Sequence, residues 1–518
     1  MRIGRSWNGV LLGCVLLLGC RRSESASATL PRLPAIFGDN MMLQQGKTIP
    51  IWGWAEAGQA VKVEFAGQKK HAIAGQEGKW MVKLDPVKAG GPHQMRVTAA
   101  GGPSVTYQNV LVGEVWVCSG QSNMDWTLKG TTGGEQVSAA AANSKIRLFV
   151  VQRAQANAPQ SDCKGRWKEC TPQTARQFSG VGYHFGAEIQ AALGVPVGLI
   201  HTAWGGTPIE AWTSERAHQE DADMNLFFQD FASRQQAYEK AMENCQSAAA
   251  RYKEEAEKAM REGRPVPAAP QKPDAPGWKP TVLYNAMIAP IVPYAIAGVI
   301  WYQGESNADN AVLYRKQFPA MIKNWREDWS QGDFPFLFVQ LANFMKREDQ
   351  PSDPDWAWLR ESQTMTLSTP KTGMAVIIDI GDSKDIHPKN KADVGKRLAL
   401  AARSVAYGQK IVYSGPMVDS MKVEGGKVRL TFKHIGGGLV GKGGQTLKGF
   451  AIAGTDRKFV WADAKIDGDT VVVSSGTVAQ PVAVRYAWAN DPECNLYNKE
   501  GLPASPFRTD DWPRQTAK

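Results

Sequence analysis

Short apolar runs alternate with longer amphipathic stretches through the middle of the chain. The runs are rich in Val, Ile and aromatic residues, and they cover residues 115–118, 146–151, 195–202, 297–301, 336–341 and 375–380. Such runs are typical of strands buried on both faces of a parallel sheet. Helical patterns lie between them, for example over 181–192 and 314–329. The alternation predicts an α/β domain over about 111–409, with a parallel sheet flanked by helices.

The two ends of the chain predict β structure instead. Residues 31–110 contain short β-rich segments separated by Gly, Pro and Asp, and the same pattern returns over 410–510. We expect a β-sandwich-like module at each end. The N-terminal module could bind sugar, but nothing in it is chemically unusual, so docking onto the next domain is the favoured interpretation. A run rich in Ala, Glu, Lys and Gln predicts a solvated helical insertion over about 214–280, closed by a Pro-rich crossing.

The first twenty residues predict an export signal rather than part of the fold. Arg2 and Arg5 precede an apolar stretch, 10–18, that is too short to span a bilayer. The stretch ends in Leu-Leu-Gly-Cys, which resembles a bacterial lipobox with Cys20 as the lipidated residue. We therefore expect a signal peptide over 1–20, a tether over 21–30, and a lipoprotein in the periplasm or on the outer-membrane surface. A plain secretory signal is the alternative.

Charge and cysteine content indicate which partners, disulfides and metal sites to expect. The 518-residue chain has 60 basic and 50 acidic residues, and the excess is spread without a long basic block. This favours solubility over nucleic-acid binding, and it leaves the lipid anchor as the expected membrane contact. Cys163 and Cys170 bracket a short segment that a disulfide could close in an exported protein. Neither CxxC nor HExxH occurs, so we expect no metal site.

Polar clusters follow four of the predicted strands at the point where each strand ends. They cover residues 119–123, 204–207, 303–307 and 381–388. Ligands of open α/β sheets bind outside the carboxyl ends of the strands. The four clusters therefore predict a site at this edge.

The clusters contain the residue types of nucleophilic acyl chemistry, which needs a serine, a histidine base and donors for an oxyanion. Ser122 and Ser306 both qualify as nucleophile, and spacing alone does not separate them. His387 is the best base, because Pro388 favours an extended backbone in which residues i and i+2 share a side. Asp385 could then orient the imidazole, with Asp382 as the fallback. A surface Asp–His pair without a catalytic role is an equally weighted alternative. His201 lies inside an apolar run, so we expect it in the core.

Four ordered motifs add a family resemblance. Gly-Gln-Ser-Asn-Met at 120–124, Trp-Gly-Gly-Thr at 204–207, Trp-Tyr-Gln-Gly-Glu-Ser-Asn at 301–307 and Asp-Ile-His-Pro at 385–388 resemble the sialate O-acetylesterase family of the SGNH hydrolases. The resemblance covers roughly 31–510, and it implies an SGNH-hydrolase-like fold.

The resemblance also implies residue roles. It makes Ser122 the nucleophile and His387 the base, with Asp385 as the acid, although such enzymes often place the acid three residues before the histidine and this chain has Lys384 there. The implied oxyanion donors are the N–H groups of Ser122 and Gly206 and the side chain of Gln303. Three further residues are candidates for substrate contact or loop support: Glu305, Asn123 and Trp204.

The activity implied by the resemblance is hydrolysis of O-acetyl esters on sugars, above all O-acetylated sialic acid, through an acyl-enzyme and without a cofactor. Two alternatives stay open. One is an acetylesterase acting on plant glycans such as acetylxylan or rhamnogalacturonan. The other is a surface glycan-binding lipoprotein without catalytic activity.

Overall fold

A computed structural model describes residues 30–514. The predicted signal peptide, its Cys20 and most of the tether lie outside the described residues. The central feature is a sheet with the strand order β13-β12-β11-β7-β10-β8-β9. Its strands are β7 (Ser104–Gly120), β8 (Asn143–Val150), β9 (Trp167–Cys170), β10 (Val197–Ala203), β11 (Gly298–Tyr302), β12 (Phe336–Gln340) and β13 (Thr372–Val376). All pairings in this order are parallel except that of β8 with β9, so the predicted α/β fold is confirmed.

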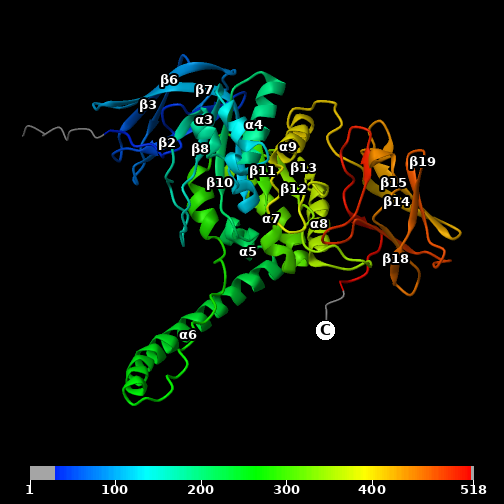
Figure 1. Ribbon diagram of the computed structural model, residues 1–518. Helices are drawn as coiled ribbons and strands as arrows, with labels where there is room; N and C mark the ends of the chain where they lie inside the picture. The colour runs from blue at the N-terminus through cyan, green and yellow to red at the C-terminus, as the bar shows by residue number, and fades with distance from the viewer. Residues whose placement is uncertain (1–29, 515–518) are drawn as a thin grey trace, which may run out of the picture.

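The strand β7 joins the N-terminal β structure to this sheet (Figure 1). Its first part pairs antiparallel with β6 (Gly90–Ala99), and its last part pairs with β10 and β11. Every residue from 110 to 120 is buried, which explains the continuous apolar run in the sequence. The expected boundary at 110–111 falls inside this strand. The remaining strands of the N-terminal module are β1 (Met42–Gln44), β2 (Ile49–Trp54), β3 (Ala60–Phe65), β4 (Gln68–Ile73) and β5 (Lys79–Leu84).

Four main helices pack around the parallel sheet. The first pair, α4 (Gly180–Leu193) and α9 (Lys391–Val405), contact each other and the strands β10 and β13. The second pair, α7 (Ala311–Trp329) and α8 (Asp355–Met365), also pack together. Both predicted helical stretches are confirmed within a few residues. The last predicted strand ends early, because β13 stops at Val376 and a turn follows, with Ile380 N–H donating to the Ile377 carbonyl at 3.3 Å.

The helical insertion is dominated by one long helix. After the short α5 (Glu215–Gln219), the helix α6 (Ala222–Arg261) extends away from the body of the molecule (Figure 1). The return limb, residues 262–280, is not helical, because its prolines lack the N–H group that a helix interior requires. No helix within residues 30–514 is long and apolar enough to cross a membrane.

The C-terminal module consists of antiparallel sheets around a second hydrophobic core. One sheet has the order β14-β15-β20-β19, with bounds Met417–Glu424, Lys427–Lys433, Thr470–Ser474 and Asp463–Asp467. The other has the order β18-β17-β21-β23, with bounds Phe459–Trp461, Phe450–Ala453, Ala483–Tyr486 and Phe507–Arg508. A short pair, β16 (Leu439–Gly441) and β22 (Leu496–Asn498), completes the module.

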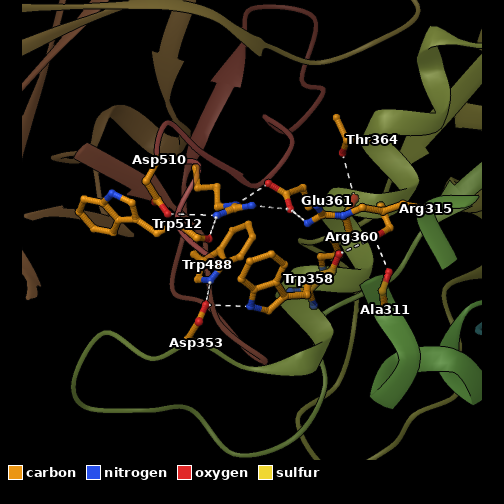
Figure 2. Close-up of polar contacts among 12 residues, drawn as sticks. Ala311, Arg315, Asp353, Trp358, Arg360, Glu361, Thr364, Trp488, Asp510 and Trp512 are labelled. Carbon is orange, nitrogen blue, oxygen red and sulfur yellow. Dashed lines mark hydrogen bonds and ion pairs between the residues drawn. The ribbon is translucent and has the colours of Figure 1, made fainter. Parts of the chain in front are cut away.

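Polar contacts fasten this module to α8. The indole N–H groups of Trp358 and Trp488 both donate to Asp353, at 2.9 and 2.8 Å, and Glu361 pairs with Arg315 (Figure 2). Arg508 adds an ion pair with Glu361 at 2.6 Å. The contacts of Trp488 and Arg508 link residues that are more than one hundred positions apart in the sequence, so no local pattern predicts them.

Arg360 is an enclosed charged group at this junction. Its guanidinium is fully buried and donates to the carbonyls of Leu341, Ala342, Ala489 and Asn490 at 2.6–3.0 Å. Burial lowers the pKa of Arg360 to about 9. Two of the four carbonyls belong to the loop that follows the C-terminal strand β21, so one side chain ties the two domains together.

The five described cysteines are all unpaired. The disulfide considered between Cys163 and Cys170 is therefore wrong for this structure. Cys170 ends β9 and its thiol contacts the Ala141 carbonyl at 3.1 Å instead.

Replacing Arg360 with alanine is expected to destabilise the protein by roughly 3–5 kcal/mol, because four buried carbonyls lose their donor. Thermal or denaturant unfolding measures the change. Arg347→Ala is the control, since the Arg347 side chain is 53% exposed and only 3.6 Å from Asp491; it should change stability by less than about 0.5 kcal/mol. Equal stability of the two variants would contradict the account of this junction.

Candidate active site

Three of the four polar clusters meet where β7, β10 and β11 end side by side. Ser119 stands opposite Thr202 of β10 and Trp301 of β11. Gly120 follows with φ +135°, and a Cβ there would lie 2.1 Å from the Tyr302 carbonyl, so the close approach of the strands requires glycine. Gln121 N–H donates to that same carbonyl at 3.0 Å, and the chain then turns into the short helix α1 (Ser122–Asp125).

The fourth cluster brings the imidazole to Ser122. His387 lies in the loop between β13 and α9, and its Nε2 is 2.9 Å from Ser122 Oγ. The Trp126 ring stacks on the imidazole, with centroids 5.1 Å apart and an interplanar angle of 21°. The serine and histidine are 265 positions apart in sequence, and the packing fixes both the distance and the plane of the ring.

The two predicted acids differ in their relation to this ring. Asp385 Oδ1 accepts the backbone N–H of His387 at 2.8 Å and lies 3.5 Å from Nδ1 of the ring, which is an ion-pair distance longer than an ordinary hydrogen bond. Asp382 instead accepts the backbone N–H of Lys384 at 2.9 Å. The geometry therefore favours Asp385 over Asp382 as the group that orients the base.

The surroundings of His387 keep its imidazole neutral at neutral pH. Partial burial lowers the pKa of His387, the nearby Asp385 carboxylate raises it, and the Lys391 ammonium lowers it again. The net direction is downward from about 6.5. A neutral ring can accept the Ser122 proton at Nε2, which is the requirement for a general base.

Backbone N–H groups near Ser122 are available for a developing negative charge. In the described part of the chain, the N–H groups of Ser122, Gly205 and Gly206 donate to no protein acceptor. Gly205 lies against the nucleophile, since a Cβ on it would be 3.2 Å from Ser122 Cβ. Gly206 adopts φ +72°, a conformation that glycine adopts at little cost. These donors are the elements of an oxyanion hole.

The side chain of Gln303 already makes hydrogen bonds within the protein. It is fully buried, its Nε2 donates to Asn307 Oδ1 at 2.7 Å and to the Thr207 carbonyl at 3.3 Å, and its Oε1 accepts from Tyr314. An oxyanion would receive one of these N–H groups only in place of the longer bond to Thr207. The assignment of Gln303 as an oxyanion donor stays a prediction.

The rival nucleophile, Ser306, contacts the loop of Ser122 through its backbone. Ser306 belongs to the 3-10 helix η5 (Glu305–Asn310), and its backbone N–H donates to Gln121 Oε1 at 3.3 Å. Gly304 N–H donates to the same oxygen at 3.2 Å. Gln121 therefore ties the third cluster to the nucleophile loop, while the imidazole contacts Ser122 rather than Ser306.

Asn123, the residue after Ser122, contacts Glu305 of the third cluster. Asn123 is 1% exposed, and its Nδ2 donates to Glu305 Oε1 at 2.5 Å and to the Ile386 carbonyl at 3.0 Å. Burial raises the pKa of Glu305. Lys391 completes this group by donating to Asn123 Oδ1. Sequence reasoning missed Lys391, and the one available signal was its position four residues after His387.

An aromatic and cationic rim lies beside the nucleophile loop. Trp204 directly precedes Gly205, and its ring contacts Trp278 edge-on at 5.1 Å. The Arg153 guanidinium lies 5.7 Å from the Trp204 ring and pairs with Asp125 of α1. Trp278 comes from the return limb of the insertion, so that insertion contributes to the rim. His201, expected in the core, is buried in β10 and lies 3.6 Å from Asp125.

The depressed pKa of His387 predicts the pH dependence of any hydrolysis at this site. The value of kcat/KM should fall as the pH drops through a pKa below about 6.5, because the protonated ring cannot accept the Ser122 proton. A pH–rate profile with an uncharged ester such as p-nitrophenyl acetate measures this acidic limb, the fall in kcat/KM at low pH.

Asp385→Asn should move that limb to still lower pH, since the carboxylate raises the pKa of His387. The plateau should also drop by at least about tenfold, because the ring loses its orienting charge. Asp382→Asn is the matched control and should leave both unchanged. A wild-type limb above pH 7, or equal effects of the two variants, would contradict this geometry.

The chain is similar to known proteins over most of its length. A family model described as carbohydrate esterase, sialic acid-specific acetylesterase, matches residues 112–260 and 272–404. The sialate O-acetylesterase of Mus musculus is 32% identical, over 96% of this chain and 98% of the mouse protein. The Homo sapiens sialate O-acetylesterase is 30% identical, over 96% of each chain. Among solved structures, a carbohydrate acetylesterase from Xanthomonas citri is 42% identical with a TM-score of 0.79, over 93% of this chain and 100% of that one.

Proposed function

This chain belongs to the carbohydrate esterase family of sialic acid-specific acetylesterases, and from that premise we propose that it removes O-acetyl groups from sugars, above all from O-acetylated sialic acid. The observation that carries the proposal is the 2.9 Å contact between Ser122 Oγ and His387 Nε2 at the joint end of three parallel strands. A hydroxyl donating to a neutral imidazole at this distance is the arrangement of an activated nucleophile.

The reaction proceeds in two steps. Ser122 Oγ attacks the acetyl carbonyl carbon while its proton passes to His387 Nε2. The carbonyl oxygen becomes an oxyanion and receives hydrogen bonds from the N–H groups of Ser122 and the Gly205–Gly206 turn. The tetrahedral intermediate collapses, the C–O bond to the sugar breaks, and Nε2 returns the proton to the sugar oxygen.

Water completes the cycle. His387 takes a proton from a water molecule, the resulting oxygen attacks the acetyl group on Ser122, and Oγ leaves with the proton returned by Nε2. The products are acetate and the free enzyme. Every proton in both steps moves through one ring nitrogen, so the fixed plane of the imidazole against Trp126 serves both halves of the reaction.

The rim supports a sugar as the leaving group. Indole faces suit the apolar faces of pyranose rings, and Trp204 and Trp278 stand beside the nucleophile loop. Arg153 offers a half-exposed guanidinium whose N–H groups are only partly used by Asp125. A cation in this position fits the carboxylate of an acidic sugar.

A second candidate substrate class is an acetylated neutral glycan of plant origin. The Xanthomonas citri protein, which is 42% identical to this chain, is named a carbohydrate acetylesterase, a description that covers both substrate classes. The chemistry at Ser122 is the same for both classes, and the difference lies in what the rim accepts.

Acetate release from a matched set of esters tests both parts of the proposal. The wild-type protein should release acetate from 9-O-acetyl sialic acid faster than from acetylxylan or an acetylated rhamnogalacturonan. Ser122→Ala should lose at least about 10⁴-fold in turnover on every substrate, because no other group forms the acyl-enzyme. Ser306→Ala is the matched control and should retain wild-type turnover. Faster release from the plant glycans would select the second substrate class, and full activity of Ser122→Ala would contradict the mechanism.

We propose further that the chain is exported and anchored through a lipid on Cys20. The support is the residue pattern of the first twenty positions, with two arginines, an apolar stretch and Leu-Leu-Gly-Cys. In a bacterial host the full-length protein should sediment with membranes, and Cys20→Ala should be recovered in the soluble fraction. Equal distribution of the two proteins would contradict the anchor.

A further inference from the structure

Lys391 is a lysine with no exposure to solvent. It is the first residue of α9, and its relative exposure is 0%. Lysine is among the residues least often fully buried, because an ammonium loses a large hydration free energy unless partners replace the water. The partners of Lys391 therefore indicate why the chain retains a cation there.

The first partner is Asn123, the residue that follows the nucleophile. Lys391 Nζ donates to Asn123 Oδ1, which orients the amide so that its nitrogen faces away. That nitrogen donates to Glu305 Oε1 at 2.5 Å and to the Ile386 carbonyl at 3.0 Å. One amide thus joins the nucleophile loop to the peptide unit directly before His387.

The consequence concerns the distance between the two reacting side chains. Ser122 directly precedes Asn123, and Ile386 directly precedes His387. Fixing Asn123 against Ile386 therefore fixes the two backbone segments that carry the 2.9 Å contact. An asparagine amide can rotate by 180° and exchange its oxygen and nitrogen. The ammonium removes that freedom, because it can only donate and so requires the oxygen on its side.

The second set of partners interacts with the positive charge of Lys391. The Lys391 ammonium lies 5.3 Å from the centre of the buried Tyr302 ring, and Glu305 and Asp385 are its carboxylate neighbours. Burial lowers the pKa of Lys391 to about 7, and both carboxylates oppose this shift. Glu305 Oε2 is enclosed and receives no hydrogen bond within the described chain, so Lys391 is the cation that balances it.

The same charge acts on the base. Lys391 lowers the pKa of His387, against Asp385, which raises it. In the pH range where the imidazole titrates, below about 6.5, the ammonium with its pKa near 7 is mostly protonated. The cation is therefore present when its effect on the base matters.

We propose that Lys391 is a positioning residue for the esterase reaction: through Asn123 it holds Ser122 and His387 at reacting distance, and through its charge it favours the neutral form of the base. The inference rests on the function proposed above. It goes beyond that function by assigning a role to a lysine that touches neither substrate nor the reacting atoms.

Lys391→Met tests the role, since methionine keeps much of the side-chain length and removes the charge and the donor. We expect kcat for p-nitrophenyl acetate to fall by about 100-fold with little change in KM, because loss of alignment affects the reacting geometry more than binding. The acidic limb of the pH profile should also move to higher pH, since the cation that lowers the pKa of His387 is gone. Lys389→Met, at an exposed position two residues earlier, is the control and should match the wild type.

A second variant separates positioning from stability. Lys391→Met leaves Glu305 without its cation, so the protein can lose stability for a reason unrelated to alignment. The double variant Lys391→Met/Glu305→Gln removes both charges and should recover thermal stability while kcat stays low and the limb stays displaced. Recovery of wild-type kcat in the double variant would show that Lys391 only balances Glu305, and it would overturn the proposal.

The outcome also separates this inference from the proposed function. The rate at which a fluorophosphonate probe labels Ser122 reports the nucleophile without any sugar. If the wild type neither labels nor hydrolyses p-nitrophenyl acetate, the proposed function fails and the role of Lys391 fails with it. If the wild type does both and Lys391→Met labels at the same rate with an unchanged pH limb, only the inference about Lys391 fails.

Discussion

The candidate active site depends on the position of β7 within the parallel sheet. Hydrogen bonding to β10 on one side and β11 on the other brings three strand ends to one edge. Gly120 allows β7 and β11 to approach closely, because any side chain there would overlap the Tyr302 carbonyl. Ser122 lies two residues after Gly120, at the end of a strand that is paired on both sides. His387, which contacts Ser122, lies in the loop before α9, 265 positions later in the sequence.

Loops that carry catalytic groups need partners for their own backbone and side chains, and here buried amides supply them. Gln121 accepts two N–H groups of the third cluster, and Asn123 links Glu305 to the loop of His387. The two amides flank Ser122 in the sequence, so the nucleophile lies between the two main points of attachment. Such a network is costly if any member is left unsatisfied. That cost explains why a buried lysine and a buried carboxylate occur together at this position.

Much of the fold could be predicted from the sequence, because strands buried on both faces appear as continuous apolar runs. The end of β13 could not, since three of the four residues 377–380 are isoleucines but the segment forms a turn. The extent of β7 was also hidden, because its first part has the mixed pattern of a half-exposed strand and its last part the pattern of a core strand.

The convergence of the polar clusters followed from topology, and the pairing of Ser122 with His387 required the family resemblance as well as the pattern. Contacts between segments that are distant in the sequence could not be predicted from the local patterns. Lys391 would be expected at the surface from its residue type alone, and the 3.5 Å separation of Asp385 from the imidazole depends on loop geometry that spacing does not determine.

We propose that Ser122, and not Ser306, is the nucleophile that His387 activates. Labelling the intact protein with a fluorophosphonate probe, followed by proteolysis and mass spectrometry of the modified peptide, tests it most directly. We expect one adduct on the peptide containing Ser122, and no adduct in His387→Ala. An adduct on Ser306, or equal labelling of Ser122 without the imidazole, would contradict it.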